Sequence, residues 1–197
     1  MIVIGGSVPL AGDDPARVRS ACLVYGPDGA RIARYDKMHL FRYADGDENY
    51  DEARTIAPGE RVVTFDAACG RVGLSICYDL RFPELYRSLT VQGATILFVP
   101  AAFRFETGVD HWEPLLRARA IEDQAFVIAA AQWGSWGPQG RERRNFGHSL
   151  VADPWGRVIA EAPDGVGVTL AELDLTEVGR VREMLPALRH RRLFPSC

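Results

Sequence analysis

The amino-acid sequence predicts an α/β protein with mixed sheets. Two continuously apolar segments, residues 95–100 and 126–131, each follow a segment with helical periodicity, which is typical of strands buried on both faces in βαβ units. Turn residues at 26–29 and 153–156 separate short strand-like segments and predict β-hairpins beside these units. Strands that alternate with helices, together with hairpins, place the chain in the α/β class.

The first half of the chain is predicted to be mostly strands. The segments on either side of the turn at residues 26–29 form a hairpin. Residues 42–60 are polar and contain Gly46 and a Pro-Gly pair, so they predict a long loop, which in compact domains is often a functional lid. The predicted strands of this half are, in order, residues 1–4, 21–25, 31–35, 62–65 and 72–76.

Helices and strands alternate in the second half. A helix is predicted over about residues 80–92, with Gly93 as its stop, and a second over about residues 111–124. Residues 133–147 are rich in Gly, Arg and Trp and predict a loop. The remaining predicted elements are a strand at residues 168–173 and a short helix at residues 177–185.

Composition narrows the classes of function. The formal net charge of −3 gives no reason to expect a nucleic-acid partner. The four cysteines form no C-x-x-C pair, so no metal site is expected. No signal peptide or membrane span is visible, so we expect no membrane association and a reducing cytoplasm as the location. The cysteines are Cys22, Cys69, Cys77 and Cys197.

Cys77 is the residue that carries most of the functional information. It stands between a predicted buried strand and a predicted helix, where a sulfur can project above the sheet edge. The first N–H groups of the helix would favour a thiolate there, which suits a nucleophile. A buried, inert core cysteine is the equally balanced alternative on this geometry.

Four separated segments resemble the nitrilase superfamily of carbon–nitrogen hydrolases. Residues 73–84 resemble its cysteine signature and residues 34–41 its lysine motif. Residues 110–122 resemble a helix of the amidase branch called Nit proteins, and residues 147–156 match the family as well. The matches span nearly the whole chain in family order, which is far more specific than one short motif.

The resemblance implies a fold and an assembly. The fold is the four-layer αββα sandwich of the nitrilase superfamily, here as one carbon–nitrogen hydrolase domain over residues 1–197. The implied assembly is a homodimer or larger homo-oligomer, whose contact face would use the two predicted central helices. The side chains expected on that face are Leu85, Trp112 and Leu116.

The resemblance also implies a catalytic centre that needs neither metal nor organic cofactor. Amide hydrolysis needs a nucleophile, a proton shuttle and an oxyanion site. Cys77 would be the nucleophile, and Lys37 would lower its pKa and donate to the oxyanion together with the backbone N–H of Tyr78. Glu52 would support the lysine. A surface lysine and an ordinary loop glutamate are the alternatives for Lys37 and Glu52.

Two further residues are expected to bind the substrate. Arg81 follows Cys77 by four residues and would pair with a carboxylate of the substrate, since Nit amidases cleave acids of this kind. Thr107 matches a pocket threonine of the family. An exposed helix arginine and a loop threonine are the alternatives. The implied reaction is cleavage of a small carboxylate-bearing amide through a cysteine thioester.

The chain departs from the family pattern at one point. Family members carry a catalytic glutamate on an N-terminal strand, and residues 1–7 resemble a later strand. We therefore expect weak amidase activity and some tendency to associate. The rival hypothesis is a truncated, catalytically impaired member that acts as a binding or self-associating protein.

Overall fold

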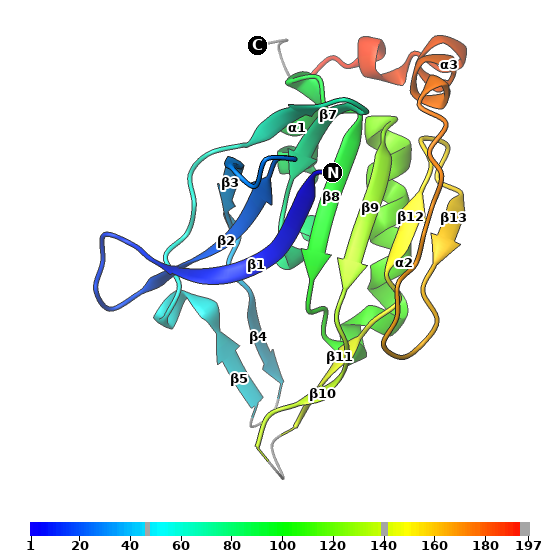
Figure 1. Ribbon diagram of the computed structural model, residues 1–197. Helices are drawn as coiled ribbons and strands as arrows, with labels where there is room; N and C mark the ends of the chain where they lie inside the picture. Colours follow the sequence, from blue (N-terminus) through cyan, green and yellow to red (C-terminus); the bar gives the residue numbers. More distant parts are fainter. Residues whose placement is uncertain (46–47, 139–141, 194–197) are drawn as a thin grey trace.

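The computed structural model describes residues 1–45, 48–138 and 142–193, and these form a three-stranded sheet, a six-stranded sheet, two small hairpins and flanking helices (Figure 1). Cys197, Gly46 and Arg141 lie outside the described residues. The strands of the first sheet are β1 (Val3–Ala11), β2 (Val18–Tyr25) and β3 (Arg31–Asp36). Those of the second are β6 (Thr64–Ala67), β7 (Gly70–Leu74), β8 (Ile96–Ala101), β9 (Phe126–Ala131), β12 (Leu150–Ala152) and β13 (Val158–Glu161).

The six-stranded sheet has the mixed character that the sequence predicts. Its strand order is β13-β12-β9-β8-β7-β6, and β7, β8 and β9 run parallel while the outer pairs are antiparallel. The crossovers are α1 (Pro83–Val91) and α2 (Phe105–Asp123). Pro83 opens α1, where a missing N–H costs nothing, and Gly93 follows the helix with a φ of 92°.

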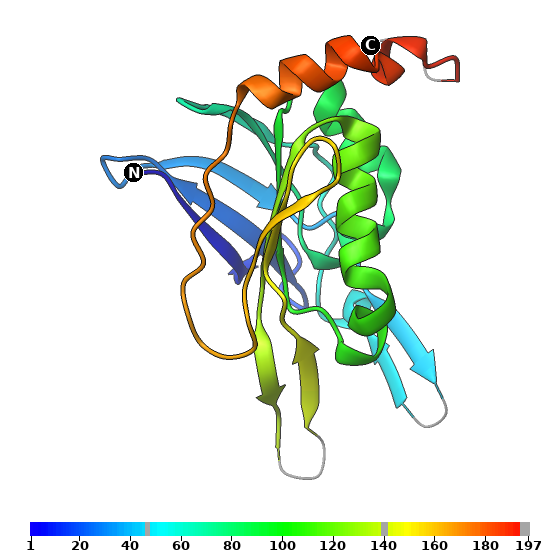
Figure 2. The same ribbon diagram turned by 90° about the vertical axis from the view of Figure 1, so that its right-hand side faces the viewer.

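Three layers can be assigned among the described residues. Figure 2 shows the three-stranded sheet on one side of the six-stranded sheet and the helices α1 and α2 on the other. Buried side chains of the small sheet, including Val24 and Tyr35, share one hydrophobic core with those of the large sheet. The α/β class with mixed sheets is therefore confirmed, and within the described residues helix, sheet and sheet form three layers of the expected αββα sandwich.

The predicted contact face between subunits is wrong at the level of side chains. Trp112 and Leu116 are completely buried and Leu85 is 3% exposed, so all three belong to the core of this chain. The indole Nε1 of Trp112 also donates to the carbonyl of His148, 2.7 Å away. The spacing of apolar residues correctly identified the buried face of each helix. That face packs against the sheet of the same chain and is not a contact between subunits.

Two segments predicted as loops are hairpins instead. Within residues 42–60, β4 (Arg42–Asp45) pairs with β5 (Glu48–Asp51), followed by the single turn η1 (Glu52–Arg54). Within residues 133–147, β10 (Trp133–Trp136) pairs with β11 (Arg143–Phe146). Both hairpins carry polar residues on both faces. Their sequences therefore lack the alternation of apolar and polar residues by which a half-buried strand is recognised.

The predicted strand at residues 168–173 does not form among the described residues. Val168 and Leu170 are 89% and 88% exposed, and the segment is irregular up to α3 (Thr176–Met184). The last short turn is η3 (Ala187–His190). An apolar alternation makes a strand only where a neighbouring strand supplies hydrogen bonds.

Helix α2 begins at Phe105, six residues before its predicted start. Gly108 lies in its first turns because Phe146 of β11 packs against it: a Cβ on this glycine would lie 2.4 Å from the Phe146 side chain. The glycine at position 108 therefore reflects the close contact with Phe146 and not the start of the helix. None of the helices within the described residues is long and apolar enough to span a bilayer.

A buried carboxylate at the C-terminal end of α2 makes folding sensitive to pH. Asp123 has no exposed surface, and neither of its carboxylate oxygens accepts a well-aligned hydrogen bond from the described residues. Arg87 Nη1 lies 3.0 Å from Asp123 Oδ1. Burial raises the pKa of Asp123 from 3.8 to about 6, and the charge of Arg87 offsets only part of this effect.

We expect Asp123→Asn to stabilise the protein above pH 6. Between pH 3.8 and about 6 the unfolded chain releases the Asp123 proton while the folded chain keeps it, so stability falls as pH rises through this window. The variant should gain roughly 1–3 kcal/mol in urea unfolding at pH 8, and little near pH 4. Asp110→Asn, at an exposed position of the same helix, is the control. A gain for Asp123→Asn that is equal at both pH values would contradict the explanation.

Candidate active site

Cys77 occupies a strained turn between a strand and a short helix. It follows β7 by two residues and opens the 3-10 helix η2 (Cys77–Arg81). Its φ of 49° lies in the left-handed region, which is uncommon for residues other than glycine and is often found at functional sites. The predicted position of the sulfur at a strand-to-helix turn is therefore correct, although the turn leads into a single 3-10 segment before α1.

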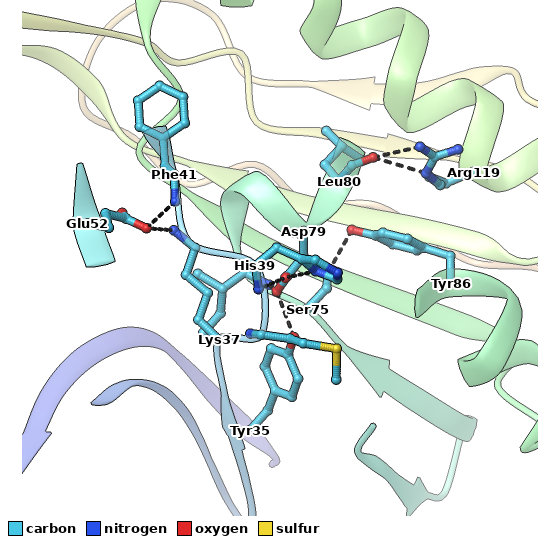
Figure 3. Close-up of polar contacts among 12 residues, drawn as sticks. Tyr35, Lys37, His39, Phe41, Glu52, Ser75, Asp79, Leu80, Tyr86 and Arg119 are labelled. Carbon is cyan, nitrogen blue, oxygen red and sulfur yellow. Dashed lines mark hydrogen bonds and ion pairs between the residues drawn. The ribbon is translucent and has the colours of Figure 1, made fainter. Parts of the chain in front are cut away.

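A buried carboxylate, Asp79, fixes this turn (Figure 3). Its Oδ2 accepts from the backbone N–H of Ile76 at 2.8 Å and from the hydroxyl of Tyr35 at 2.7 Å. Its Oδ1 accepts from the backbone N–H of His39 at 3.0 Å and lies 2.7 Å from His39 Nδ1. A buried carboxylate with this many donors is stable in its charged form. Asp79 therefore ties the turn to the end of β3.

The hydrogen bonds of Asp79 to the end of β3 place Lys37 inside the protein. Lys37 follows β3 directly, and its side chain is only 3% exposed. Its Nζ lies 2.5 Å from Glu52 Oε2, which also accepts from the backbone N–H of Phe41 at 2.7 Å (Figure 3). The buried ammonium is thus paired, as a buried charge must be. Lys37 is no surface lysine, and Glu52 holds it in place.

All six predicted site residues line a single cavity of about 360 Å³. Ile76 and Cys77 line the cavity, and the three-stranded sheet contributes Ser7 and Ser20 to the lining. Both hairpins, β4–β5 and β10–β11, supply wall residues. The predicted site residues at this cavity are Lys37, Glu52, Cys77, Tyr78, Arg81 and Thr107.

The pKa of the Cys77 thiol is raised overall, although Lys37 lowers it as expected. Burial raises the pKa of Cys77 above its ordinary value, and this effect exceeds the lowering caused by the charge of Lys37. The backbone N–H of Ala102 also donates to the sulfur and lowers the pKa, whereas the charge of Glu52 raises it. The site can stabilise a thiolate, but forming it requires a proton acceptor.

Arg81 lines the same cavity as Cys77, and its guanidinium lies against an imidazole and two aromatic rings. Its Nη1 and Nη2 are each 3.3 Å from His111 Nδ1, and its Cζ lies 5.4 Å from the ring centroid of Phe103 and 6.0 Å from that of Tyr78. Among the residues that the structure describes, Arg81 forms no ion pair with a carboxylate. Its charge is therefore available to an anion that enters the cavity.

Thr107 lies in the first turn of α2, so the alternative of a loop threonine does not hold. Its hydroxyl is 3.3 Å from the carbonyl of Arg104, to which it donates. The side chain is half-buried and remains on the cavity wall.

Sequence reasoning missed several residues that shape the site. Asp79 was passed over, although a charged residue two positions after Cys77, between Tyr78 and Leu80, is itself a signal of a buried hydrogen-bond network. Ala102 acts through its backbone, so no side-chain pattern could identify it. Arg143 comes from a hairpin that was predicted as a loop.

The comparisons with known proteins place this site in a family. A family model described as carbon–nitrogen hydrolase matches residues 1–183. The deaminated glutathione amidase of Yersinia enterocolitica is 41% identical over 194 residues, which cover 97% of this chain and 67% of that protein. Omega-amidase NIT2 of Homo sapiens is 37% identical over 194 residues, covering 96% of this chain and 67% of that protein. The chain thus spans about two thirds of the length of these relatives.

Solved structures agree with the sequence matches. The NitFhit protein of C. elegans superposes with a TM-score of 0.92 at 41% identity, over 100% of this chain and 48% of that chain. A mutant amidase from Nesterenkonia sp. AN1 has a TM-score of 0.74 at 27% identity, over 94% of this chain and 63% of that chain. That amidase was solved with the acetamide moiety of fluoroacetamide added covalently at its active site cysteine.

We expect Lys37→Met to raise the pKa of Cys77 further, because it removes the positive charge that lowers it. A rise of roughly one pKa unit would slow alkylation by iodoacetamide about tenfold at pH 7. The measurement is the rate of Cys77 labelling against pH, followed by peptide mass spectrometry. Exposed Cys69 serves as the internal control and should keep its rate. An unshifted profile, or one displaced to lower pH, would show that Lys37 does not act on the thiol.

Proposed function

Because the chain belongs to the carbon–nitrogen hydrolase family, in the Nit branch of the nitrilase superfamily, we propose that it hydrolyses the amide bond of a small carboxylate-bearing amide through a thioester on Cys77. The observation that carries the proposal is the arrangement in one cavity of a paired lysine, a cysteine at a strained turn and an arginine with a free charge. The family match over residues 1–183 supports a single domain.

The proposed reaction assigns each residue a step. The thiolate of Cys77 attacks the amide carbonyl, and Lys37 with the Tyr78 N–H stabilises the resulting oxyanion. The C–N bond then breaks and the amine leaves with a proton. Water hydrolyses the thioester and returns the thiol. Arg81 holds the carboxylate of the acyl half, since a guanidinium fork matches a carboxylate bidentately.

Proton transfer from the thiol is the step that should limit the rate. Burial raises the pKa of Cys77, so little thiolate is present near neutral pH. Glu52, the cavity carboxylate beside Lys37, already accepts from Lys37 and from the backbone of Phe41. We therefore expect slow turnover that increases with pH.

The substrate class follows from the arginine and from the relatives named deaminated glutathione amidase and omega-amidase. Both names fit a short acid amide, such as a 2-oxo-dicarboxylic acid monoamide. We further propose a cytoplasmic location, which suits the free thiols of Cys22, Cys69 and Cys77.

The test of the proposal is ammonia release from α-ketoglutaramate and from a neutral amide of similar length. We expect turnover of the acidic amide below the typical scale of roughly 1–10 per second, and none for Cys77→Ser. Arg81→Lys should lower kcat/KM on the acidic amide by roughly ten- to hundredfold, and less on the neutral amide, because a point charge replaces a planar fork.

The outcomes separate the hypotheses. Equal losses on both amides would mean that Arg81 holds structure and does not bind substrate. Ligand binding without any turnover, at any pH, would favour a binding or self-associating protein over an amidase.

We also propose that the protein forms a homodimer through the outer side of α2. Ile121 and Trp155 are 50% and 42% exposed, and Gly156 packs against Ile121, so the two apolar side chains lie on one surface. Light scattering at micromolar concentration should give twice the mass of the chain, and Ile121→Glu should give the monomer. A monomer for the unmodified chain would refute this assembly.

A further inference from the structure

The guanidinium of Arg81 contacts an imidazole that has no role in the proposed reaction. Nη1 and Nη2 of Arg81 each lie 3.3 Å from His111 Nδ1. The cavity-lining residues among the described part of the chain include Arg81 but not His111, which is exposed on α2. Any effect of His111 on a bound substrate must therefore pass through Arg81.

The chemistry of the two groups fixes the protonation state of His111. A guanidinium has N–H donors and no acceptor, so Arg81 is the donor in both contacts. The Nδ1 atom of His111 can accept only if its lone pair is free. The imidazole is therefore neutral, with its proton on Nε2, because a protonated ring would place a second positive charge and an N–H against the guanidinium.

Helix α2 places His111 against the short helix η2 that carries Arg81. His111 and Arg119 are eight residues apart on α2, a spacing that puts both on one stripe of the helix. Arg119 is only 5% exposed, and its Nε and Nη2 donate to the carbonyl of Leu80 at 3.0 and 2.8 Å (Figure 3). The same helix thus fixes the backbone just before Arg81 and the end of the Arg81 side chain.

The contact with His111 uses one edge of the guanidinium and leaves another edge open. Nη1 and Nη2 each direct an N–H at the same Nδ1 atom, so His111 occupies the end of the guanidinium. Among the described residues, the Nε–H of Arg81 has no hydrogen-bond acceptor. This N–H and the second N–H of the neighbouring Nη point the same way, and together they match the two oxygens of a carboxylate.

Two aromatic rings restrict the guanidinium further. Its Cζ lies 5.4 Å from the ring centroid of Phe103 and 6.0 Å from that of Tyr78. Rings attract the cation but accept no in-plane N–H bond, so they do not determine which edge of the guanidinium is open. The rotation of the guanidinium in its own plane is set by His111, since its Nδ1 is the hydrogen-bond acceptor found for Arg81 among the described residues.

We propose that neutral His111 is a positioning residue, which orients Arg81 so that its Nε edge receives the carboxylate of the substrate. This inference rests on the proposed amidase function and identifies the residue that prepares its anion-binding group. An arginine side chain has many rotamers, and fixing them costs free energy when it occurs on binding. With His111 in place this cost is met when the protein folds, so the anion binds more tightly.

The test measures glutaramate binding by calorimetry to the full chain carrying Cys77→Ser, which prevents turnover. His111→Leu keeps an apolar side chain of moderate size and removes the acceptor. It should weaken glutaramate binding roughly three- to tenfold, the range for one long side chain that must be immobilised on binding. His111→Asn offers an acceptor oxygen close to the position of Nδ1, and it should restore most of the affinity.

A second readout separates positioning of Arg81 from support of the whole turn. Cys77 opens η2 and Arg81 ends it, so damage to this segment should also change the alkylation rate of Cys77 by neutral iodoacetamide, measured with the cysteine intact. We expect His111→Leu to leave that rate unchanged. Val109→Ala, at a position of α2 whose side chain is 56% exposed, is the matched control and should change neither measurement.

Three results would overturn the inference. Unchanged glutaramate affinity in His111→Leu would show that Arg81 needs no positioning by this residue. Equal weakening in His111→Leu and His111→Asn would show that the acceptor is not what matters. Weaker binding together with an altered alkylation rate in His111→Leu would make His111 a structural support of η2.

Failure of the proposed function would look different. Glutaramate that does not bind the Cys77→Ser chain, or that binds equally well after Arg81→Ala, would refute the acyl site itself and the inference with it. Binding that is lost in Arg81→Ala but kept in His111→Leu would leave the proposed function intact and refute only the role of His111.

Discussion

The geometry of the candidate site depends on the buried carboxylate of Asp79. It joins the turn that carries Cys77 in the six-stranded sheet to the end of β3 in the three-stranded sheet, through Tyr35 and His39. Burial raises the pKa of Tyr35 well above its ordinary value, so this phenol stays a neutral donor. The charge of the buried Asp79 carboxylate is stable only while its hydrogen-bond donors are present. Moving the two sheets apart would remove donors and would therefore have a large cost in free energy.

The chemistry of the cavity follows from this constraint. Lys37 follows a strand of the three-stranded sheet, and Cys77 follows a strand of the six-stranded sheet. Lys37 is only two residues from His39, so the same contact that fixes the turn brings the ammonium to the thiol. The carboxylate of Glu52 balances the charge of Lys37, and burial raises the pKa of the Cys77 thiol. The site is thus preorganised for the oxyanion more than for the thiolate.

The sequence predicted the parts of this structure that depend on local patterns. The parallel strands β8 and β9 were recognisable because burial on both faces leaves a continuous apolar run. The turn at Cys77 was predicted from the apolar run before it and the helical periodicity after it. The roles expected for Lys37 and Glu52 came from family motifs. The hairpins at the cavity mouth were not recognisable, since contacts such as that between Arg143 and Tyr50 order them from far along the chain. The partners of Asp79 were not recognisable either, since two of its donors, Tyr35 and His39, lie about forty residues away in the chain.

The most direct test of this account is a double-mutant cycle on the alkylation rate of Cys77 at neutral pH, with Asp79→Asn and Lys37→Met separately and together. If Asp79 acts by holding Lys37 beside the thiol, then Lys37→Met should slow alkylation strongly in the native background and have little further effect in Asp79→Asn. Strictly additive effects of the two substitutions on the logarithm of the rate would contradict the account, because they would show that Asp79 does not position Lys37.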